Sequence, residues 1–148
     1  MKDLSKFLVM NMNDPMRKNH VLAVVKPGFE TLLGTLCALF KKNGYEIVKT
    51  KTTKLSLEQA KQLYKVHSKE DFYSNLCNYM CSGPTTAFIL KKDNLFNIFD
   101  EFAKLKDKIR EDFGESDMRN VLHSSDSYKS FTHEAGIYFY NVNQEDLL

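Results

Sequence analysis

The sequence contains only three cysteines, which are Cys37, Cys77 and Cys81. Three cysteines cannot all pair, and they lie among apolar residues rather than in a regular framework, which argues against a disulfide-built secreted domain. Buried thiols in a reducing compartment are favoured instead, and we expect a cytoplasmic protein. Cys77 and Cys81 lie four residues apart, but no histidine at suitable spacing completes a zinc site. We therefore expect no metal ion held by protein side chains.

The sequence also has little excess of positive over negative charge. The formal net charge at pH 7 is +2, and the basic residues are spread along the chain with acidic residues between them. A protein that binds duplex nucleic acid concentrates its basic residues in a patch or stripe, so we do not expect sequence-specific nucleic-acid binding. No apolar run approaches the roughly 20 residues that span a bilayer. We therefore expect no transmembrane helix and no membrane partner.

The chain is predicted to consist of an N-terminal extension, residues 1–18, and one domain, residues 19–148. Leu4 to Met12 is only weakly amphipathic, and the run Asn-Met-Asn-Asp-Pro at 11–15 breaks the pattern. The apolar part of the extension is too short for a secretory signal, and its acidic residues argue against a transit peptide. The whole chain is long enough to bury a core as a single domain without a disulfide or metal staple.

Hydrophobic periodicity in the domain alternates between strand-like and helix-like segments. Val21–Val25 is a continuous apolar run that ends in Lys26-Pro27-Gly28, which predicts a buried strand closed by a turn. Apolar residues then recur at helical spacing from Leu32 to Phe40, and Asn43-Gly44 supplies a helix stop. Tyr45 to Lys54 alternates as a second strand.

The second half of the domain continues this alternation. The pattern predicts helices from Ser56 to Tyr64, from Ser68 to Met80 and from Leu95 to Leu105, a strand over Thr85–Leu90, a short helix that begins near Ser127 and includes Glu134, and a last strand over Gly136–Tyr140. We expect the serines at the starts of the first two helices to cap them. The order of elements predicts an α+β fold of the ferredoxin-like, split β-α-β type, with a four-stranded antiparallel sheet backed by helices.

His123 is the side chain that most strongly indicates chemistry. It lies between the apolar pair Val121-Leu122 and the polar run Ser124-Ser125-Asp126-Ser127. An imidazole nitrogen is a nucleophile near neutral pH, and neighbouring hydroxyl and carboxylate groups can hold both the ring and the group that it attacks. Taken alone, the same pattern also fits an ordinary surface histidine in a serine-rich loop.

Four segments, in order along the chain, resemble the nucleoside diphosphate kinases. They are Val24–Pro27, Tyr79–Pro84, Ile109–Phe113 and Asn120–Ser127, the last followed by Glu134. The resemblance extends from about Val21 to Phe139, and the histidine segment is its most specific part. It implies a transferase that moves the γ-phosphoryl group of a nucleoside triphosphate to a nucleoside diphosphate through a phosphohistidine on His123. It also implies Mg²⁺, held by the nucleotide phosphates and water.

The resemblance implies roles for the side chains around the reacting group. Glu134 would hold the second nitrogen of His123, and Ser125 would hydrogen-bond Glu134 or the phosphate. Lys26 and Arg110 would supply the cations that a loose phosphoryl-transfer transition state needs around its equatorial oxygens. Each cation also has a purely structural interpretation, Lys26 as the polar end of a buried strand and Arg110 as a cation at a helix C-terminus.

The resemblance further implies three nucleotide contacts: Tyr64 near the phosphates, Asn120 on a sugar hydroxyl and Phe72 stacked on the base. Core packing explains Tyr64 and Phe72 nearly as well, because both lie at helical spacing among apolar neighbours. Arg119 is predicted to be a surface or salt-bridge residue. The other histidines, which are His20, His67 and His133, have no partner that the sequence identifies.

Two departures from the family bear on activity. Gly28-Phe29-Glu30-Thr31 follows Lys26-Pro27, where the family has Asp-Gly and then an arginine. The stretch Lys91–Lys108 contains no arginine and no Asn-Pro turn. The family has a long loop there, which supplies an arginine and a threonine to the phosphates and contacts in a hexamer. The helix from Asn94 is instead predicted to run directly into Arg110.

The missing loop leaves two functional hypotheses open. Two phosphate ligands are lost unless Lys104 or Lys106 replaces one as a point charge, without the bidentate geometry of an arginine. The loss of a charged donor slows phosphoryl transfer severely. The chain is therefore either a working but slow kinase, or a weakly active or inactive nucleotide-binding or scaffold module with the same fold. We expect a homo-oligomer that is at least a dimer, rather than the hexamer of the family.

Overall fold

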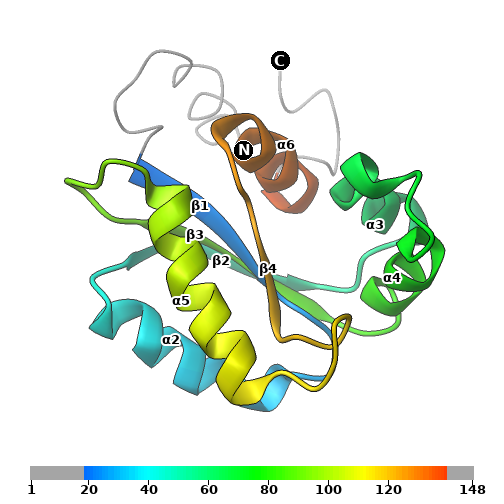
Figure 1. Cartoon of the computed structure of the whole chain (residues 1–148), viewed down its shortest axis with the longest axis horizontal. Helices are drawn as coiled ribbons and strands as arrows, with labels where there is room; N and C mark the ends of the chain where they lie inside the picture. The colour runs from blue at the N-terminus through cyan, green and yellow to red at the C-terminus, as the bar shows by residue number, and fades with distance from the viewer. Residues whose placement is uncertain (1–18, 140–148) are drawn as a thin grey trace.

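A four-stranded antiparallel sheet in the order β2-β3-β1-β4 organises the part of the chain that the computed structural model describes, residues 19–139 (Figure 1). The strands are β1 (His20–Val25), β2 (Glu46–Thr53), β3 (Thr85–Lys91) and β4 (Leu122–Ser124). This arrangement confirms the predicted α+β fold with its antiparallel sheet. The extension predicted at 1–18, and Tyr140 of the predicted last strand, lie outside the described residues.

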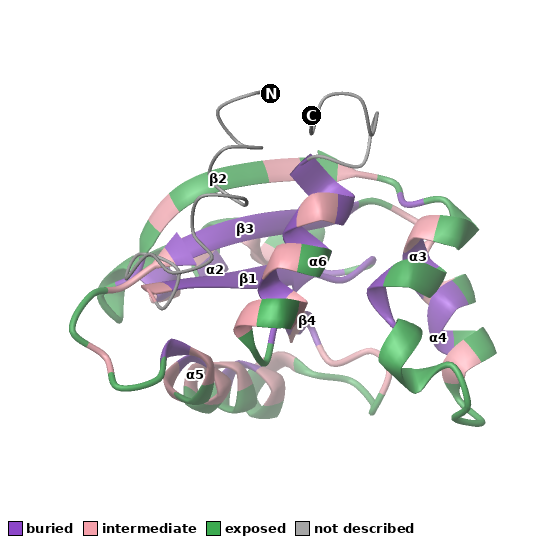
Figure 2. Cartoon of the chain, turned by 90° about the horizontal axis from the view of Figure 1, so that it is seen from above, coloured by how far each residue is buried: buried purple, intermediate pink, exposed green. Residues whose placement is uncertain are grey.

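Helices cover both faces of the sheet, because side chains of β1 and β3 alternate between two apolar cores. The helices are α2 (Leu33–Lys42), α3 (Leu57–Leu63), α4 (Tyr73–Met80), α5 (Ile98–Phe113) and α6 (Tyr128–Phe139). Leu22 and Val24 share one core with α3, α4 and α6, whereas Val21 and Ala23 share the other with α2 and α5. Buried residues run along β1 and β3, but the edge strand β2 is largely exposed (Figure 2).

Ser56 caps the start of α3, as the sequence predicts, and the structure shows that the cap is a capping box with Gln59. Ser56 Oγ accepts a hydrogen bond from the amide of Gln59 at 3.1 Å, and Gln59 Oε1 accepts one from the amide of Ser56 at 2.9 Å. The cap predicted at Ser68 is wrong, because Ser68 ends a short 3-10 turn (Lys65–His67) and α4 begins only at Tyr73.

Ser56→Ala should lower the free energy of unfolding by about 1 kcal/mol, because it removes the hydrogen bond that Ser56 Oγ accepts from the amide of Gln59 in the first turn of α3. Urea unfolding followed by circular dichroism measures the loss. Ser68→Ala is the matched control, since Ser68 caps no α-helix, and its midpoint should equal that of the unmodified chain. Equal midpoints for the two variants would show that the capping box contributes nothing.

The end of the described chain departs from the prediction. Gly136–Phe139 is the last turn of α6 rather than a strand, and the fourth strand is β4, which is three residues long. Phe131, Ala135 and Tyr138 are buried at helical spacing against the sheet, so tertiary packing outweighs the β-preference of the aromatic run. A three-residue strand is too short to leave an alternating pattern in the sequence, and β4 is defined by its pairing with β1.

α5 is one continuous helix from Ile98 to Phe113, which confirms that the helix runs into Arg110 without an intervening loop. It begins after Asn97 rather than at Asn94, because the side chain of Asn97 accepts hydrogen bonds from two amides of the first turn. Ile98, Phe102 and Ile109 are its buried residues and fix the helix against the sheet. Within residues 19–139, none of the helices combines the length and apolar character that a membrane crossing needs.

Candidate active site

His123 lies in β4, opposite Val24 of β1, and only 17% of its side chain is exposed. The ring Nε2 and Oε1 of Glu134 are 2.7 Å apart. A carboxylate accepts hydrogen bonds and cannot donate them, so this contact holds the ring with its proton on Nε2 and leaves the lone pair on Nδ1. The geometry therefore presents one nucleophilic nitrogen, Nδ1, on a ring whose orientation is fixed.

The backbone just before the histidine is held in a left-handed conformation. Val121 has a φ of 82°, which a β-branched residue rarely adopts, and its side chain is fully buried. Its carbonyl accepts a hydrogen bond from the amide of Lys26 at 2.8 Å, which ties the end of β1 to the start of β4. Such a conformation persists only where the surrounding structure imposes it. The backbone itself therefore places Lys26 beside His123.

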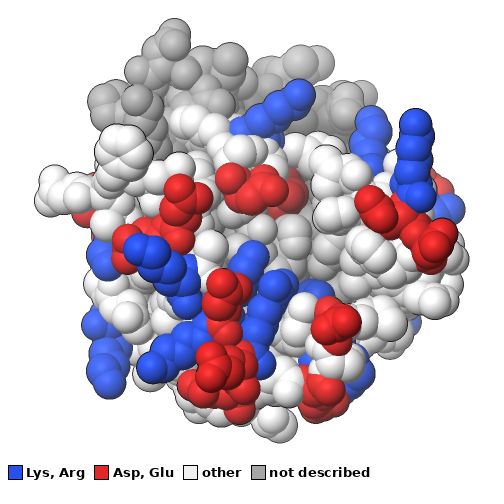
Figure 3. Space-filling view, in the orientation of Figure 1, with Lys and Arg blue, Asp and Glu red and all other residues white. Residues whose placement is uncertain are grey.

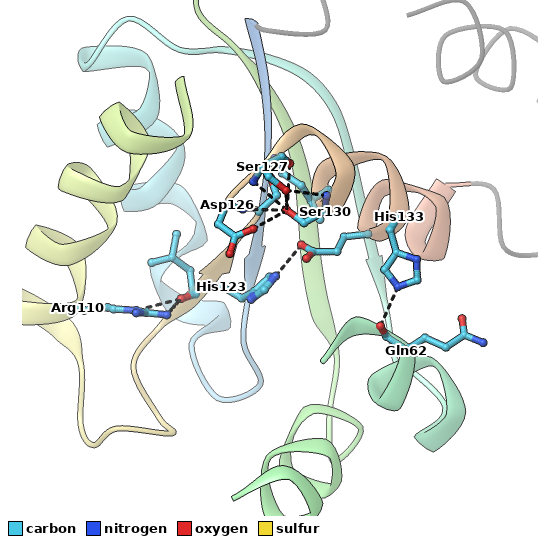
Figure 4. A network of polar contacts seen from close by, with 11 residues as sticks. Gln62, Arg110, His123, Asp126, Ser127, Ser130 and His133 are labelled. Atoms are coloured by element: carbon cyan, nitrogen blue, oxygen red, sulfur yellow. Dashed lines mark hydrogen bonds and ion pairs between the residues drawn. The ribbon is translucent and has the colours of Figure 1, made fainter. Parts of the chain in front are cut away.

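Glu134 is presented by α6, whose start is fixed by a network of serine hydrogen bonds (Figure 4). The amide of Ser130 donates to Ser127 Oγ at 3.1 Å, and the Ser130 hydroxyl donates to Asp126 Oδ1 at 2.9 Å. Glu134 follows one turn later and is 6% exposed. The turn between β4 and α6 thus sets the distance between the carboxylate and the imidazole of His123.

Three basic side chains lie together beside the histidine, and we call Lys26, Lys106 and Arg110 the cation cluster. Arg110 donates from Nε and Nη2 to the carbonyl of Leu122 at 3.2 and 2.8 Å (Figure 4). Lys26 is 4% exposed and donates from Nζ to the carbonyl of Met118 at 3.2 Å. Within residues 19–139, no member of the cluster forms an ion pair with a carboxylate.

The cation cluster is electrostatically unsatisfied. Burial, followed by the charges of Arg110 and Lys106, lowers the pKa of Lys26 from 10.5 to about 7. Burial is also the main cause that lowers the pKa values of Lys106 and Arg110. Cations that are fixed in place and disfavour one another's charge are typical of a site that takes up an anion.

Two buried polar atoms have no hydrogen-bond partner within the described residues, and these are the hydroxyl of Tyr64 and Oδ1 of Asn120. The Tyr64 ring lies edge-on to the His123 ring with a centroid distance of 5.2 Å, and burial raises the pKa of its hydroxyl. Asn120 donates from Nδ2 to the carbonyl of Asp117 at 2.7 Å, which leaves its oxygen unused. Buried polar atoms usually have a partner, so both atoms have unused hydrogen-bonding capacity next to the candidate site.

A pocket of about 590 Å³ opens beside His123 and Glu134. Its walls are the segment Gln62–His67 and the turn between β4 and α6. The ring of His67 in this pocket is 5.5 Å from the ring of Phe72, centroid to centroid. Phe72 is 48% exposed, so core packing does not explain it, and its face is available to stack on a planar group.

Comparison with known proteins identifies the family. Residues 19–143 match a family model described as nucleoside diphosphate kinase. The chain belongs to the nucleoside diphosphate kinase family. This confirms the resemblance noted in the sequence and the class of enzyme that it implies, a phosphotransferase.

Relatives with this name cover most of the chain. A nucleoside diphosphate kinase of Prosthecochloris aestuarii is 33% identical over 127 residues, which are 80% of this chain and 90% of that protein. One from Kosmotoga olearia is 33% identical over 115 residues, which are 73% of this chain and 78% of that protein. The crystal structure of the Aquifex aeolicus nucleoside diphosphate kinase is similar with a TM-score of 0.70 at 26% identity, and the match covers 80% of this chain and 93% of that chain.

The hydroxyl of Ser125 is hydrogen-bonded to the strand β1. Its hydroxyl accepts a hydrogen bond from the amide of Leu22 at 2.9 Å, and its amide donates to the carbonyl of Leu22 at 2.9 Å. Ser125 is 1% exposed, and within residues 19–139 no hydrogen bond joins it to Glu134. Ser125 therefore fastens the chain after β4 to β1, and its expected contact with the phosphate stays a prediction.

Arg119 is a salt-bridge residue, as the sequence predicts. It pairs with exposed Glu115 at 2.8 Å, and its guanidinium lies over the rings of Phe29 and Tyr79. These contacts support the turn after β1 in this kinase, where Gly28 has a φ of 93° and a Cβ would meet the Arg119 guanidinium at 2.7 Å. Glycine is required here, in the segment where the sequence departs from the family.

Two side chains near the kinase site carry little signal in the sequence. His67 lines the pocket between Tyr64 and Phe72, but its spacing from other motifs identifies no partner for it. The sequence does not show which of Lys104 and Lys106 could replace a phosphate ligand, and only their positions on α5 distinguish them. The described residues contain no group of three His, Cys, Asp or Glu side chains that could hold a metal ion.

Proposed function

We propose that this kinase transfers the γ-phosphoryl group of a nucleoside triphosphate to a nucleoside diphosphate through a phosphohistidine at Nδ1 of His123. The 2.7 Å contact between Nε2 and Glu134 carries the proposal, because it fixes both the ring and its proton. Nδ1 attacks the γ-phosphorus, the bond to the β–γ bridging oxygen breaks, and the nucleoside diphosphate leaves. A second nucleoside diphosphate then attacks the phosphohistidine, takes the phosphoryl group and returns His123 to its starting form.

The cation cluster suits the charge that this reaction develops on the phosphoryl oxygens. Lys26 and Arg110 are already held by backbone carbonyls, so little reorganisation is needed when charge appears. Magnesium enters as part of the nucleotide substrate, bound by phosphate oxygens and water, where it neutralises their charge.

The unpaired polar atoms and the exposed ring suit the rest of the nucleotide. The Tyr64 hydroxyl can donate to a phosphate oxygen, and Asn120 Oδ1 can accept from a ribose hydroxyl. Phe72 offers an aromatic face to the base, a contact that tolerates every base and suits an enzyme with low base specificity.

The continuity of α5 favours a second candidate function, a nucleotide-binding or scaffold module with little or no transfer. Because α5 replaces a loop, the stretch Lys91–Lys108 supplies no arginine to the phosphates. Such a module would bind nucleotide and form phosphohistidine very slowly or not at all.

The same replacement removes loop contacts between subunits, so we propose a cytoplasmic homodimer rather than a hexamer for either function.

Labelling distinguishes the two functions. The full chain is incubated with γ-labelled ATP and Mg²⁺, and label that is stable in base and labile in acid is measured on the protein. We expect such label, its loss in His123→Ala, and its transfer to GTP when GDP is added. Glu115→Ala is the control, because Glu115 is an exposed carboxylate that pairs with Arg119 and does not line the pocket, and it should keep the label.

Two results would contradict the phosphohistidine mechanism. One is label that survives His123→Ala, which would place the phosphoryl group elsewhere. The other is absence of label on a chain that binds ADP and ATP in a separate calorimetric titration, which would favour the scaffold module.

A further inference from the structure

Lys106 lies on α5 one turn before Arg110 and is half-buried, unlike its basic neighbours Lys104 and Lys108, which are exposed. The partial burial of Lys106 follows from its position around the axis of α5. Phe102 is fully buried, and at 100° per residue Lys106 lies roughly 40° from it around the helix axis, whereas Lys104 lies roughly 200° away. Lys106 therefore flanks the buried stripe of α5 on the side that carries Arg110, and Lys104 faces solvent.

The three members of the cation cluster come together from two elements. Lys26 follows β1, while Lys106 and Arg110 are held by α5, and Arg110 is bonded to the carbonyl that directly precedes His123. Lys and Arg side chains lie along α5 and between α5 and β4 on the face shown in Figure 3, interspersed with acidic side chains. Arg110 and Lys26 therefore bring the cluster next to the backbone that directly precedes His123.

The carboxylates nearest to Lys106 do not neutralise it. Asp107, followed by Asp126 and Glu134, favours the charged form of Lys106 only through its charge and forms no ion pair with it. Asp126 instead accepts a hydrogen bond from Ser130, and Glu134 contacts His123. Within the described residues, Lys106 forms no ion pair, whereas exposed Lys104 pairs with Glu101 at 3.6 Å. Three neighbouring cations that form no ion pair within the described residues suit an external anion that carries several charges.

We propose that Lys106 is a phosphate-binding residue of this site, which α5 supplies to the terminal phosphates of a nucleoside di- or triphosphate beside Lys26 and Arg110. The inference rests on the proposed function, since it takes the nucleotide as the anion. An ammonium group on a flexible four-carbon stem acts as a point charge and can follow phosphate oxygens as they move between nucleotide and histidine. A helix thus provides a charge where no loop is available to bring one.

The test compares ADP and AMP binding to the full chain by isothermal titration calorimetry. Lys106→Ala should raise the Kd for ADP by about 10-fold or more, as expected for the loss of a charged hydrogen-bond donor, and should change the Kd for AMP much less. Lys106→Arg should keep most of the affinity, because it keeps the charge. Lys104→Ala is the matched control on the same helix and should match the unmodified chain for both nucleotides.

Two outcomes would overturn the role of Lys106. Unchanged ADP affinity in Lys106→Ala would show that the side chain does not reach the phosphates. An equal loss of ADP and AMP affinity would show that Lys106 acts on the site as a whole. Far-ultraviolet circular dichroism of the same samples would identify an unfolded variant. If Lys106→Ala is unfolded, Lys106→Gln takes its place in the titrations. If the unmodified chain forms no phosphohistidine but Lys106→Ala still weakens ADP binding, the proposed function fails and the binding role stands.

Discussion

Glu134→Ala should slow formation of phosphohistidine on His123 about 100-fold, the upper range for removal of a group that orients a reactive histidine. Without the carboxylate, the ring loses the contact that keeps the proton on Nε2 and the lone pair on Nδ1. Glu134→Gln should be slowed less, because its side-chain oxygen can still accept from Nε2 although the charge is gone. The single-turnover rate of label transfer from γ-labelled ATP measures both.

The nucleotide affinity of these variants separates orientation from binding. Glu134 lies on α6, whereas the cations and Asn120 come from β1, α5 and the segment before β4, so the Kd for ADP should change little. Glu115→Ala, which removes an exposed carboxylate paired with Arg119, is the control and should leave the transfer rate unchanged. A normal transfer rate in Glu134→Ala would refute the role of the carboxylate in holding the imidazole.

The histidine and its partner were predictable to different degrees. His123 stands out in the sequence because its neighbours form a specific run of apolar and then hydroxyl residues. Glu134 could be assigned only through the family resemblance, because no periodicity shows that residues 123 and 134 lie 2.7 Å apart. Their contact depends on the tight turn between β4 and α6, which Ser127 and Ser130 stabilise.

The helices were easier to predict than the short strand. The absence of an Asn-Pro turn between Lys91 and Lys108 correctly predicted an uninterrupted α5, and Ser56 correctly predicted the start of α3. The three residues of β4 became a strand through pairing with β1, a long-range contact that local pattern does not contain. The same limit explains Ser125, whose hydroxyl is used by the Leu22 amide of the neighbouring strand.

The charges of the site show why burial has to be known before chemistry can be assigned. In the sequence, Lys26 is one lysine after an apolar run, with nothing to show that it is 4% exposed and close to two other cations. The structural interpretation of Arg110, a cation at a helix C-terminus, also holds, since Arg110 lies in the last turn of α5. Its guanidinium nevertheless points to the Leu122 carbonyl beside His123, so position on the helix and a role in the site are compatible.

Binding of ADP should weaken by up to about tenfold per pH unit above pH 7.5, because Lys26 must take up a proton to meet the phosphates. Burial with Arg110 and Lys106 nearby lowers the pKa of Lys26 to about 7 in the free protein, so its charged form is present below pH 7 and lost above it. A bound polyphosphate favours the charged form and raises this pKa again. Between the two pKa values the complex holds more protons than the free protein, and the Kd therefore rises with pH.

Calorimetry can detect this proton directly. Titrations of ADP at pH 8 in buffers with different ionisation enthalpies should show uptake of up to one proton. The Kd values measured from pH 7.5 to 9 should give the dependence of log Kd on pH. The phosphate itself, with a second pKa of about 6, is already ionised in this range. Lys26→Arg keeps the charge at every pH, so it should abolish both the uptake and the slope. If Lys26→Arg shows the same slope as the unmodified chain, another group takes up the proton. A flat profile with no uptake in the unmodified chain would mean that Lys26 is already charged at pH 8, despite its burial beside Arg110 and Lys106.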